Sequence, residues 1–280
     1  MEAKTEVVVY NSEKPSIPTT ISAVDLSKKL QKSMLRLKGE FMSEDGKGVA
    51  YPKLKTSPLF KEYKEDACLL QTIDLNTLSE DEKIPFFINI YNALTIHSLA
   101  EQTELPDSVL KMYQFWRTAA YNIGGHVYTL DDIEHGILRG NRSHPASNQP
   151  LFSEKDPRLK FAVKKVDPRI HFALVCGAKS CPAINVYSPA NKDHALDEAT
   201  RNFCRQEVSM FTESDEIWLS KIFQWYRQDF GETDTDVIRW TIPYLDANQQ
   251  DRANLLLLKL EKIGQVDIKY NEYDWSLNKS

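Results

Sequence analysis

The stretch Asp167-Pro-Arg-Ile-His-Phe-Ala-Leu-Val-Cys-Gly-Ala-Lys-Ser-Cys-Pro182 combines a short apolar run with two cysteines that are five residues apart. It opens on an Asp-Pro pair, and residues 170–175 are short and mainly apolar, which predicts a buried strand. The strand is expected to end at Cys176, and Cys181 follows five residues later. Since loops after strands often carry chemistry, we expect functional residues here.

One histidine and two of the chain's four cysteines lie in this stretch. Alternation along a strand would point His171 and Cys176 to opposite faces, so a partnership needs the turn that returns Cys181, or a residue from elsewhere. Buried reduced cysteine is also a common core residue. Packing and chemistry therefore stand as alternatives for these cysteines.

Composition limits the class of protein. Of 280 residues, 41% are hydrophobic and 10% aromatic, which is enough for a substantial core. The net charge of -5 gives no electrostatic case for binding nucleic acid. The chain has no apolar run long enough for a membrane span, no signal-peptide pattern at its start, and too few cysteines for a disulfide framework. We expect a cytoplasmic protein with no membrane partner, no cofactor and a small-molecule or peptide substrate.

Hydrophobic spacing and capping residues predict a mostly helical chain. Ser57-Pro58 and the capping box from Ser79 to Glu82 mark two helix starts. Helices are expected at 24–42, 58–70, 84–102, 106–117, 188–208, 222–230, 234–245 and 248–263, and short strands near 121–128, 170–175, 216–219 and 266–275. We therefore predict an α+β fold, with a loose arm at 1–20 and one domain with a small β-sheet at 21–280.

The helix at 84–102 is apolar nearly all round, yet Asn89, Asn92 and His97 are set into it. Burial on most sides is expected, and a buried amide needs hydrogen-bond partners. These side chains either tie the helix to loop backbone or line a polar cleft as substrate-binding groups.

A second polar group begins the helix expected after Thr129. Asp131 and His135 are four residues apart, so they share a helix face, with Glu134 and Arg139 close by. A carboxylate beside a histidine fixes its tautomer and favours its charged form, as an acid–base pair requires. A satisfied structural network would look the same from the sequence.

Four segments give the chain a resemblance to the DUF547 family, an uncharacterised group of plant, animal and bacterial proteins. They are residues 87–97, 124–139, 167–182 and 273–278. The resemblance extends over roughly 55–278, and because the family is uncharacterised it implies little about chemistry.

The first functional hypothesis is a cysteine-dependent hydrolase or acyltransferase. Cys181 is the expected nucleophile, because it follows a flexible turn beside Lys179, with His135 as base and Asp131 orienting it. The alternative nucleophile is Cys176, the alternative base His171, and the alternative orienting groups are Glu134 and Asn89. The arrangement is loosely similar to papain- or transglutaminase-like cores, by analogy alone.

Other hypotheses remain open. The polar residues can serve a non-catalytic interaction domain, Cys176 and Cys181 can form a thiol–disulfide switch, or a metal can bind His135, His171 and the two cysteines. The cysteine spacing is loose for zinc, and we expect no metal. We expect the polar residues of the three central motifs to converge on one cleft. The set is Asn89, Asn92, Asp131, Glu134, His135, His171, Cys176 and Cys181.

Overall fold

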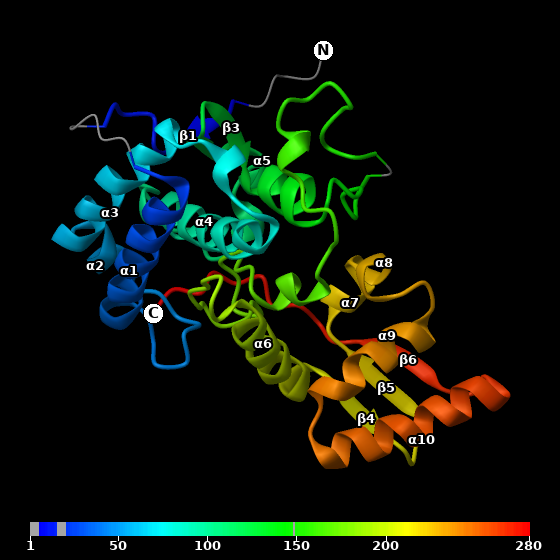
Figure 1. Cartoon of the computed structure of the whole chain (residues 1–280). Coiled ribbons are helices and arrows are strands. Elements are labelled where there is room, and N and C mark those ends of the chain that lie inside the picture. Colours follow the sequence, from blue (N-terminus) through cyan, green and yellow to red (C-terminus); the bar gives the residue numbers. More distant parts are fainter. Residues whose placement is uncertain (1–5, 16–20, 148) are drawn as a thin grey trace. The chain divides into compact units, whose positions relative to one another are not determined.

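The computed structural model describes residues 6–15, 21–147 and 149–280 of the chain (Figure 1). Helices make up 52% of it and strands 11%, in two three-stranded sheets. The prediction of a mostly helical α+β fold is therefore confirmed. The papain-like analogy stays a prediction.

The chain divides into two compact units. The first contains Met1–Val166, Leu174–Lys192 and Trp275–Ser280, and the second contains Asp167–Ala173 and Asp193–Asp274. Each unit has its own sheet. That residues 21–280 form one domain stays a prediction.

The first unit combines helices with the sheet β1-β2-β3. Its α-helices are α1 (Ala23–Phe41), α2 (Tyr51–Lys55), α3 (Pro58–Cys68), α4 (Glu80–Ala100) and α5 (Phe115–Thr118), and its strands are β1 (Val8–Val9), β2 (Ala119–Ile123) and β3 (His126–Thr129). Two left-handed glycines, Gly124 and Gly125, join β2 to β3 in a tight hairpin. Strand β1 pairs with β2 in parallel, so part of the segment expected to be a loose arm belongs to the sheet. Residues 1–5 and 16–20 of that segment lie outside the described residues.

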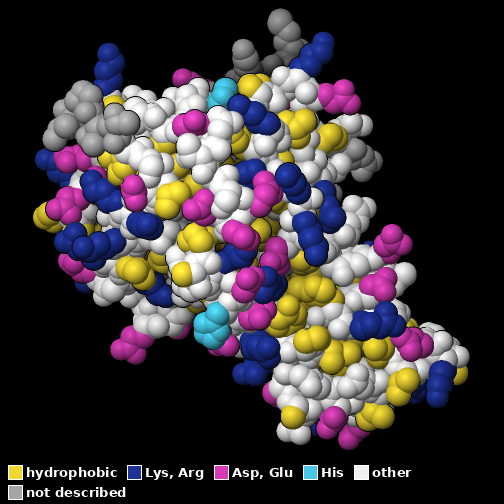
Figure 2. Space-filling view, in the orientation of Figure 1, with side chains coloured by type: hydrophobic (Ala, Val, Ile, Leu, Met, Phe, Trp, Pro, Cys, Tyr) yellow, Lys and Arg dark blue, Asp and Glu magenta, His cyan; other side chains and the backbone are white. Residues whose placement is uncertain are grey.

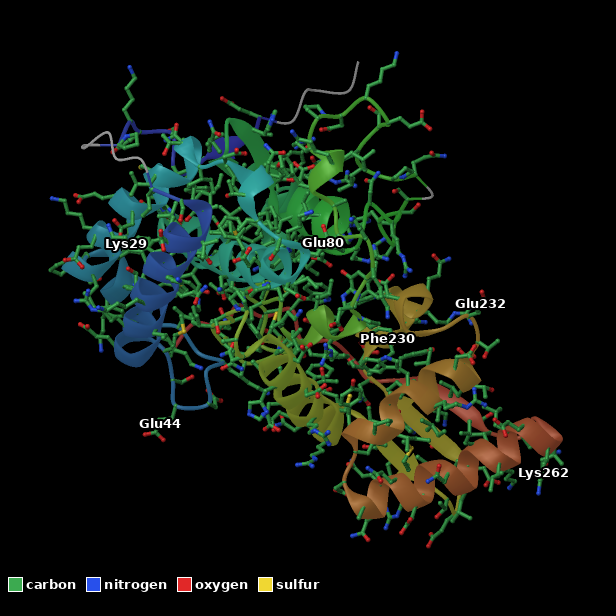
Figure 3. All side chains as sticks on the ribbon, viewed as in Figure 1. Lys29, Glu44, Glu80, Phe230, Glu232 and Lys262 are labelled. Carbon is green, nitrogen blue, oxygen red and sulfur yellow. The ribbon has the colours of Figure 1, made fainter. Side chains whose placement is uncertain are left out.

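Helix α4 organises the first unit. The capping box at Ser79 and Glu82 forms as predicted, and Glu80, in the first turn, is labelled in Figure 3. Nearly every residue from Pro85 to Ala100 is buried, and α4 packs against α1, α2 and β2. A helix buried on all sides can hold polar side chains only where they find partners.

The second unit encloses an aromatic core. Its elements after the short 3-10 helix η6 (Pro168–Phe172) are α6 (Lys192–Glu207), β4 (Ser209–Phe211), β5 (Glu216–Leu219), α7 (Lys221–Trp225), α8 (Arg227–Phe230), α9 (Asp234–Thr241), α10 (Ala247–Ile263) and β6 (Asp267–Tyr270). Phe172, Phe223 and Phe230 pack in ring contact around Trp240. Figure 3 labels Phe230 in this core and Lys262 at the far end of α10.

The strand predicted at 170–175 is wrong. Residues Pro168–Phe172 form the 3-10 helix η6, and no strand occurs between 167 and 182. The Asp167 side chain accepts the N–H of Arg169 at 3.0 Å, and Pro168 supplies the φ of a helical turn. A short apolar run is compatible with either a buried strand or a buried helical turn. Here the N-cap at Asp167 favours the helical turn.

The prediction of one helix at 106–117 is also wrong. The chain forms the 3-10 turn η3 (Val109–Lys111) and the single turn α5 instead. Gln114 between them has a left-handed φ of 45°, which interrupts a continuous helix.

The surface mixes charges. On the face seen in Figure 2, basic and acidic side chains are interspersed. Leu255, Leu258 and Ile263 of α10 are exposed. Among the described residues, no helix combines the length and apolar character that a bilayer-spanning segment needs.

Candidate functional site

The most unusual local backbone of the first unit is a π-helix, η4 (Asp132–Leu138), directly after β3. Its closing bond runs from the N–H of Arg139 to the carbonyl of Glu134, five residues back, at 2.8 Å. A side chain at Gly136 would collide with the ring of Phe152, so glycine is required there. π-Helical turns are rare and frequently occur at functional sites.

The π-helix gathers titratable side chains around His135. One ligand atom each from Asp131, His135 and His144 lies within 4.8 Å of the others. The rings of His135 and His144 meet edge to face, with centroids 4.4 Å apart. His144 comes from the loop after the π-helix, and it was not singled out from the sequence. We call Asp131, Glu134, His135 and His144 the histidine–carboxylate cluster.

Hydrogen-bond donors fix the protons on both rings. Nη1 of Arg139 lies 2.9 Å from Nδ1 of His135, and because a guanidinium can only donate, Nδ1 must accept. The Nδ1 of His144 accepts the backbone N–H of Ala146 at 3.0 Å. A neutral histidine that accepts at Nδ1 carries its proton on Nε2. Both rings therefore present a protonated Nε2.

Two carboxyl groups complete the cluster. Glu134 accepts the Tyr91 hydroxyl at 3.1 Å, and its other oxygen lies 4.0 Å from Nε2 of His135. Asp131 receives Nε of Arg117 at 3.4 Å. The Arg117 side chain is 54% exposed, so solvent reaches this side of the cluster.

Burial sets the electrostatics of the cluster. Burial and, to a smaller extent, the nearby charge of Glu134 raise the pKa of Asp131 to about 7, against the opposing effect of Arg117. Burial also lowers the pKa of His144, although Glu134 acts in the opposite sense. At neutral pH His144 is therefore uncharged, and Asp131 gains and loses its proton near pH 7.

The ligand atoms of the cluster are close enough together to bind a cation, but the hydrogen bonds of the two histidines favour proton transfer over metal binding. A histidine that ligates a metal through one ring nitrogen usually donates from the other to an acceptor. Here Nδ1 of each ring faces a donor, Arg139 or the Ala146 N–H. The arrangement is suited to proton transfer.

Cys176 and Cys181 form a second feature of the first unit. Their Sγ atoms are 2.8 Å apart, and both are reduced. The sequence predicted an accessible Cys181, but Cys181 is only 3% exposed, and the half-buried Cys176 is the more exposed of the two. The turn does not project Cys181 outward; it folds the thiol back toward the N–H of Cys176, which donates to it at 3.2 Å.

Both amides of α4 bind loop backbone, the first of the two roles considered for them. Asn89 donates to the carbonyl of Tyr187 at 2.6 Å and accepts its N–H at 2.9 Å. Asn92 accepts the N–H of Val175 at 2.9 Å. Their role in binding substrate stays a prediction.

His171 lies in the second unit. Its Nε2 is 2.8 Å from Asp229, both side chains are almost fully buried, and the ring stacks on Tyr226 with centroids 4.0 Å apart. These contacts explain why a histidine occurs in η6. Among the described residues, the side chains grouped closely enough to hold a metal ion are Asp131, His135 and His144. The alternative set with His171 and the two cysteines stays a prediction.

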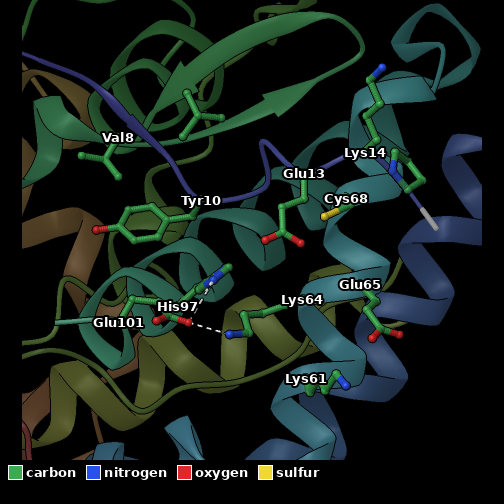
Figure 4. Close-up of a pocket in the computed structure, with 12 residues that line it drawn as sticks. Val8, Tyr10, Glu13, Lys14, Lys61, Lys64, Glu65, Cys68, His97 and Glu101 are labelled. Atoms are coloured by element: carbon green, nitrogen blue, oxygen red, sulfur yellow. Dashed lines mark hydrogen bonds and ion pairs between the residues drawn. The ribbon is translucent and has the colours of Figure 1, made fainter. Parts of the chain in front are cut away.

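His97 lines a separate pocket of about 500 Å³ between β1, α3 and α4 (Figure 4). Its Nδ1 lies 2.7 Å from the Tyr121 hydroxyl, and Glu101 links it to Lys64 at the pocket wall. Burial lowers the pKa of His97 to about 3, so the ring is neutral at physiological pH. Its contacts with Phe60 and Tyr63 give it a place in an aromatic core.

The histidine–carboxylate cluster and the cysteine pair both lie in the part of the chain that matches a known protein family. Residues 75–204, just under half of the chain, match the family described as "Protein of unknown function, DUF547". These residues belong to the DUF547 family. The DUF547 match contains three of the four segments that carried the resemblance and leaves out 273–278. No curated protein and no solved structure matches the chain.

Proposed function

We propose that this protein is a hydrolase or group-transfer enzyme in which the histidine–carboxylate cluster moves protons. The observation that carries the proposal is the pairing of two histidines, each with Nδ1 engaged by an N–H donor, with two buried carboxyl groups. The proposed substrate is a small molecule or peptide, and the proposed location is the cytoplasm.

The proton chemistry follows from the two kinds of group. Asp131, with its pKa near 7, can accept a proton from an attacking water or hydroxyl at neutral pH. Asp131 then returns that proton to the leaving group, while the Nε2–H of neutral His135 or His144 donates a hydrogen bond to the negative charge that develops on the substrate. Arg139 opposes a second proton on His135, which keeps that ring neutral between steps.

A thiol mechanism is the second form of this proposal. The sequence favoured Cys181 as nucleophile with His135 as base. Because Cys181 is buried, Cys176 is the more exposed thiol and the better candidate by accessibility. Substituting each cysteine with alanine distinguishes the two. Loss of turnover on Cys176→Ala alone would identify Cys176, loss on Cys181→Ala alone would identify Cys181, and full activity of both variants would remove the thiol mechanism.

The test is turnover of chromogenic p-nitrophenyl esters and peptide p-nitroanilides by the purified chain. Asp131→Asn and His135→Gln should each lower kcat/KM by roughly 10²- to 10⁴-fold, the usual contribution of a general acid or base. His194→Gln, on an exposed histidine of α6, is the matched control and should leave kcat/KM unchanged. Equal rates for the native chain and both cluster variants would contradict the proposal and favour an interaction domain.

A further inference from the structure

The loop that carries Cys176 and Cys181 is held firmly in the first unit. Asn92 of α4 binds the N–H of Val175, just before the loop. On the other side, the N–H of Asn278 donates to the carbonyl of Gly177 at 2.9 Å, and the N–H of Lys179 donates to the carbonyl of Ser276 at 2.9 Å. The distance between the two thiols is therefore set by the backbone.

Glycine is needed for this turn. Gly177 has a left-handed φ of 88°, and a Cβ there would approach Cδ1 of Leu99 to 2.7 Å. The turn closes with the N–H of Cys181 donating to the carbonyl of Ala178 at 3.1 Å. This conformation points both sulfur atoms to the same place.

The sulfur positions are close to those of a bonded pair. The Sγ atoms are 2.8 Å apart, less than about 1 Å longer than the roughly 2.05 Å of a disulfide. The N–H of Cys176 donates to Sγ of Cys181, a contact that stabilises a thiolate there. The half-buried Cys176 is reachable from solvent, whereas Cys181 is only 3% exposed.

We propose that Cys176 and Cys181 are a dithiol modification site that closes into an intramolecular disulfide by exchange with a small-molecule disulfide such as oxidised glutathione. The Cys176 thiolate attacks one sulfur of the small molecule, forming a mixed disulfide and releasing one thiolate. The Cys181 thiolate then attacks the Cys176 sulfur and releases the second thiolate. The protein loses two protons and two electrons, and the small disulfide takes them up to become two thiols.

The other two cysteines provide an internal comparison. Cys68 and Cys204 are each buried alone among the described residues, and burial raises the pKa of both thiols. Neither has a second described cysteine within bonding reach. Exchange should therefore be confined to Cys176 and Cys181.

The test is peptide mapping of the whole folded chain after equilibration in mixtures of reduced and oxidised glutathione. Trypsin cleaves after Lys179, so the bridge would join peptides 170–179 and 180–192. We expect the bridged form to exceed the mixed disulfide on Cys176 by about tenfold or more, because the second thiol is already positioned. Circular dichroism confirms that each sample is folded.

Variants separate the two cysteine roles. Cys181→Ser should trap glutathione on Cys176, Cys176→Ser should leave Cys181 largely unmodified, and a chain with Cys68→Ser and Cys204→Ser should still form the bridge. Recovery of Cys176 and Cys181 as separate glutathione adducts, or bridging through Cys68 or Cys204, would overturn the inference. So would a folded chain whose thiols all stay reduced in oxidised glutathione alone. None of these results depends on the acid–base proposal.

Discussion

Asp131 is a residue whose ionisation opposes folding. Its pKa rises from 3.8 to about 7 in the folded chain, so between these values the native state holds a proton that the unfolded state has lost. The free energy of unfolding therefore falls as pH rises from about 4 to 7. At about 1.4 kcal/mol for each pH unit, the loss approaches roughly 4 kcal/mol.

Asp131→Asn should remove this penalty. By urea unfolding, we expect the variant to be more stable than the native chain at pH 8, by up to about 4 kcal/mol, and nearly equal to it at pH 4. A variant that is less stable than the native chain at pH 8 would mean that the ionised carboxylate is favourably partnered, as a bound cation would make it.

His97 has the opposite pH dependence. Its pKa falls from 6.5 to about 3 on folding, so the unfolded state binds a proton in this range and the native state does not. The free energy of unfolding should fall by roughly 2 kcal/mol from pH 6.5 to 4.5 because of this histidine. His97→Gln should be less stable overall, but its free energy of unfolding should depend less on pH between 6.5 and 4.5. If urea unfolding gave the same pH dependence for the variant and the native chain, His97 would not be its source.

At the residue scale the sequence predicted part of the cluster. The spacing of Asp131, Glu134, His135 and Arg139 was enough to group them. His144 could not be found, because it is a single histidine in a polar loop. Its position depends on tertiary contacts, among them the bond from Arg139 to the carbonyl of Ser143.

At the scale of elements, a hydrogen bond joins α4 to the residue before the cysteine loop. Val175 is buried, and its N–H donates to Asn92. Asn92→Ala would leave that donor without its side-chain acceptor, so we expect a loss of about 2 kcal/mol in the free energy of unfolding. Asn76→Ala, at an exposed position, is the control and should stay within about 0.5 kcal/mol of the native chain. Equal stability of the two variants would show that the bond contributes nothing.

Closing the cysteine loop should stabilise the first unit. A disulfide across a loop of this length restricts the unfolded chain, with an expected gain of roughly 2 kcal/mol. The gain is measured as the difference in urea unfolding between oxidised and reduced protein. A chain with both Cys176→Ser and Cys181→Ser should show no difference, and an oxidised native chain less stable than the reduced one would indicate a strained bridge.

Element prediction succeeded where local chemistry determines structure. The cap at Ser57 marked the start of α3, and the capping box at Ser79 formed as predicted, although α4 begins at Glu80 and not at Ile84. The prediction failed at 170–175, where the sequence of a capped 3-10 turn has the same apolar pattern as a buried strand. The π-helix was expected as an α-helix, because one added residue in a turn leaves no mark on hydrophobic spacing.

At the scale of the whole molecule, the mostly helical α+β class followed from counting helical patterns against short strands. The division into two units did not, because residues 167–173 and 275–280 join elements far away in the sequence. Such long-range pairings are absent from local periodicity and from turn residues. For the same reason the sequence did not predict the contact of His171 with Asp229, which lies 58 residues further along the chain in the second unit.

Proton positions in the histidine–carboxylate cluster can be measured on the whole folded chain without knowing its substrate. The measurement is the set of imidazole ¹⁵N shifts of His135 and His144 at pH 7, assigned by comparison with His135→Gln and His144→Gln. We predict that both rings are neutral, with the proton on Nε2 and Nδ1 accepting from Arg139 and the Ala146 N–H. Protons on Nδ1, or loss of the Nε2 proton when Zn²⁺ is added, would contradict proton transfer as the role of the cluster and favour a metal site.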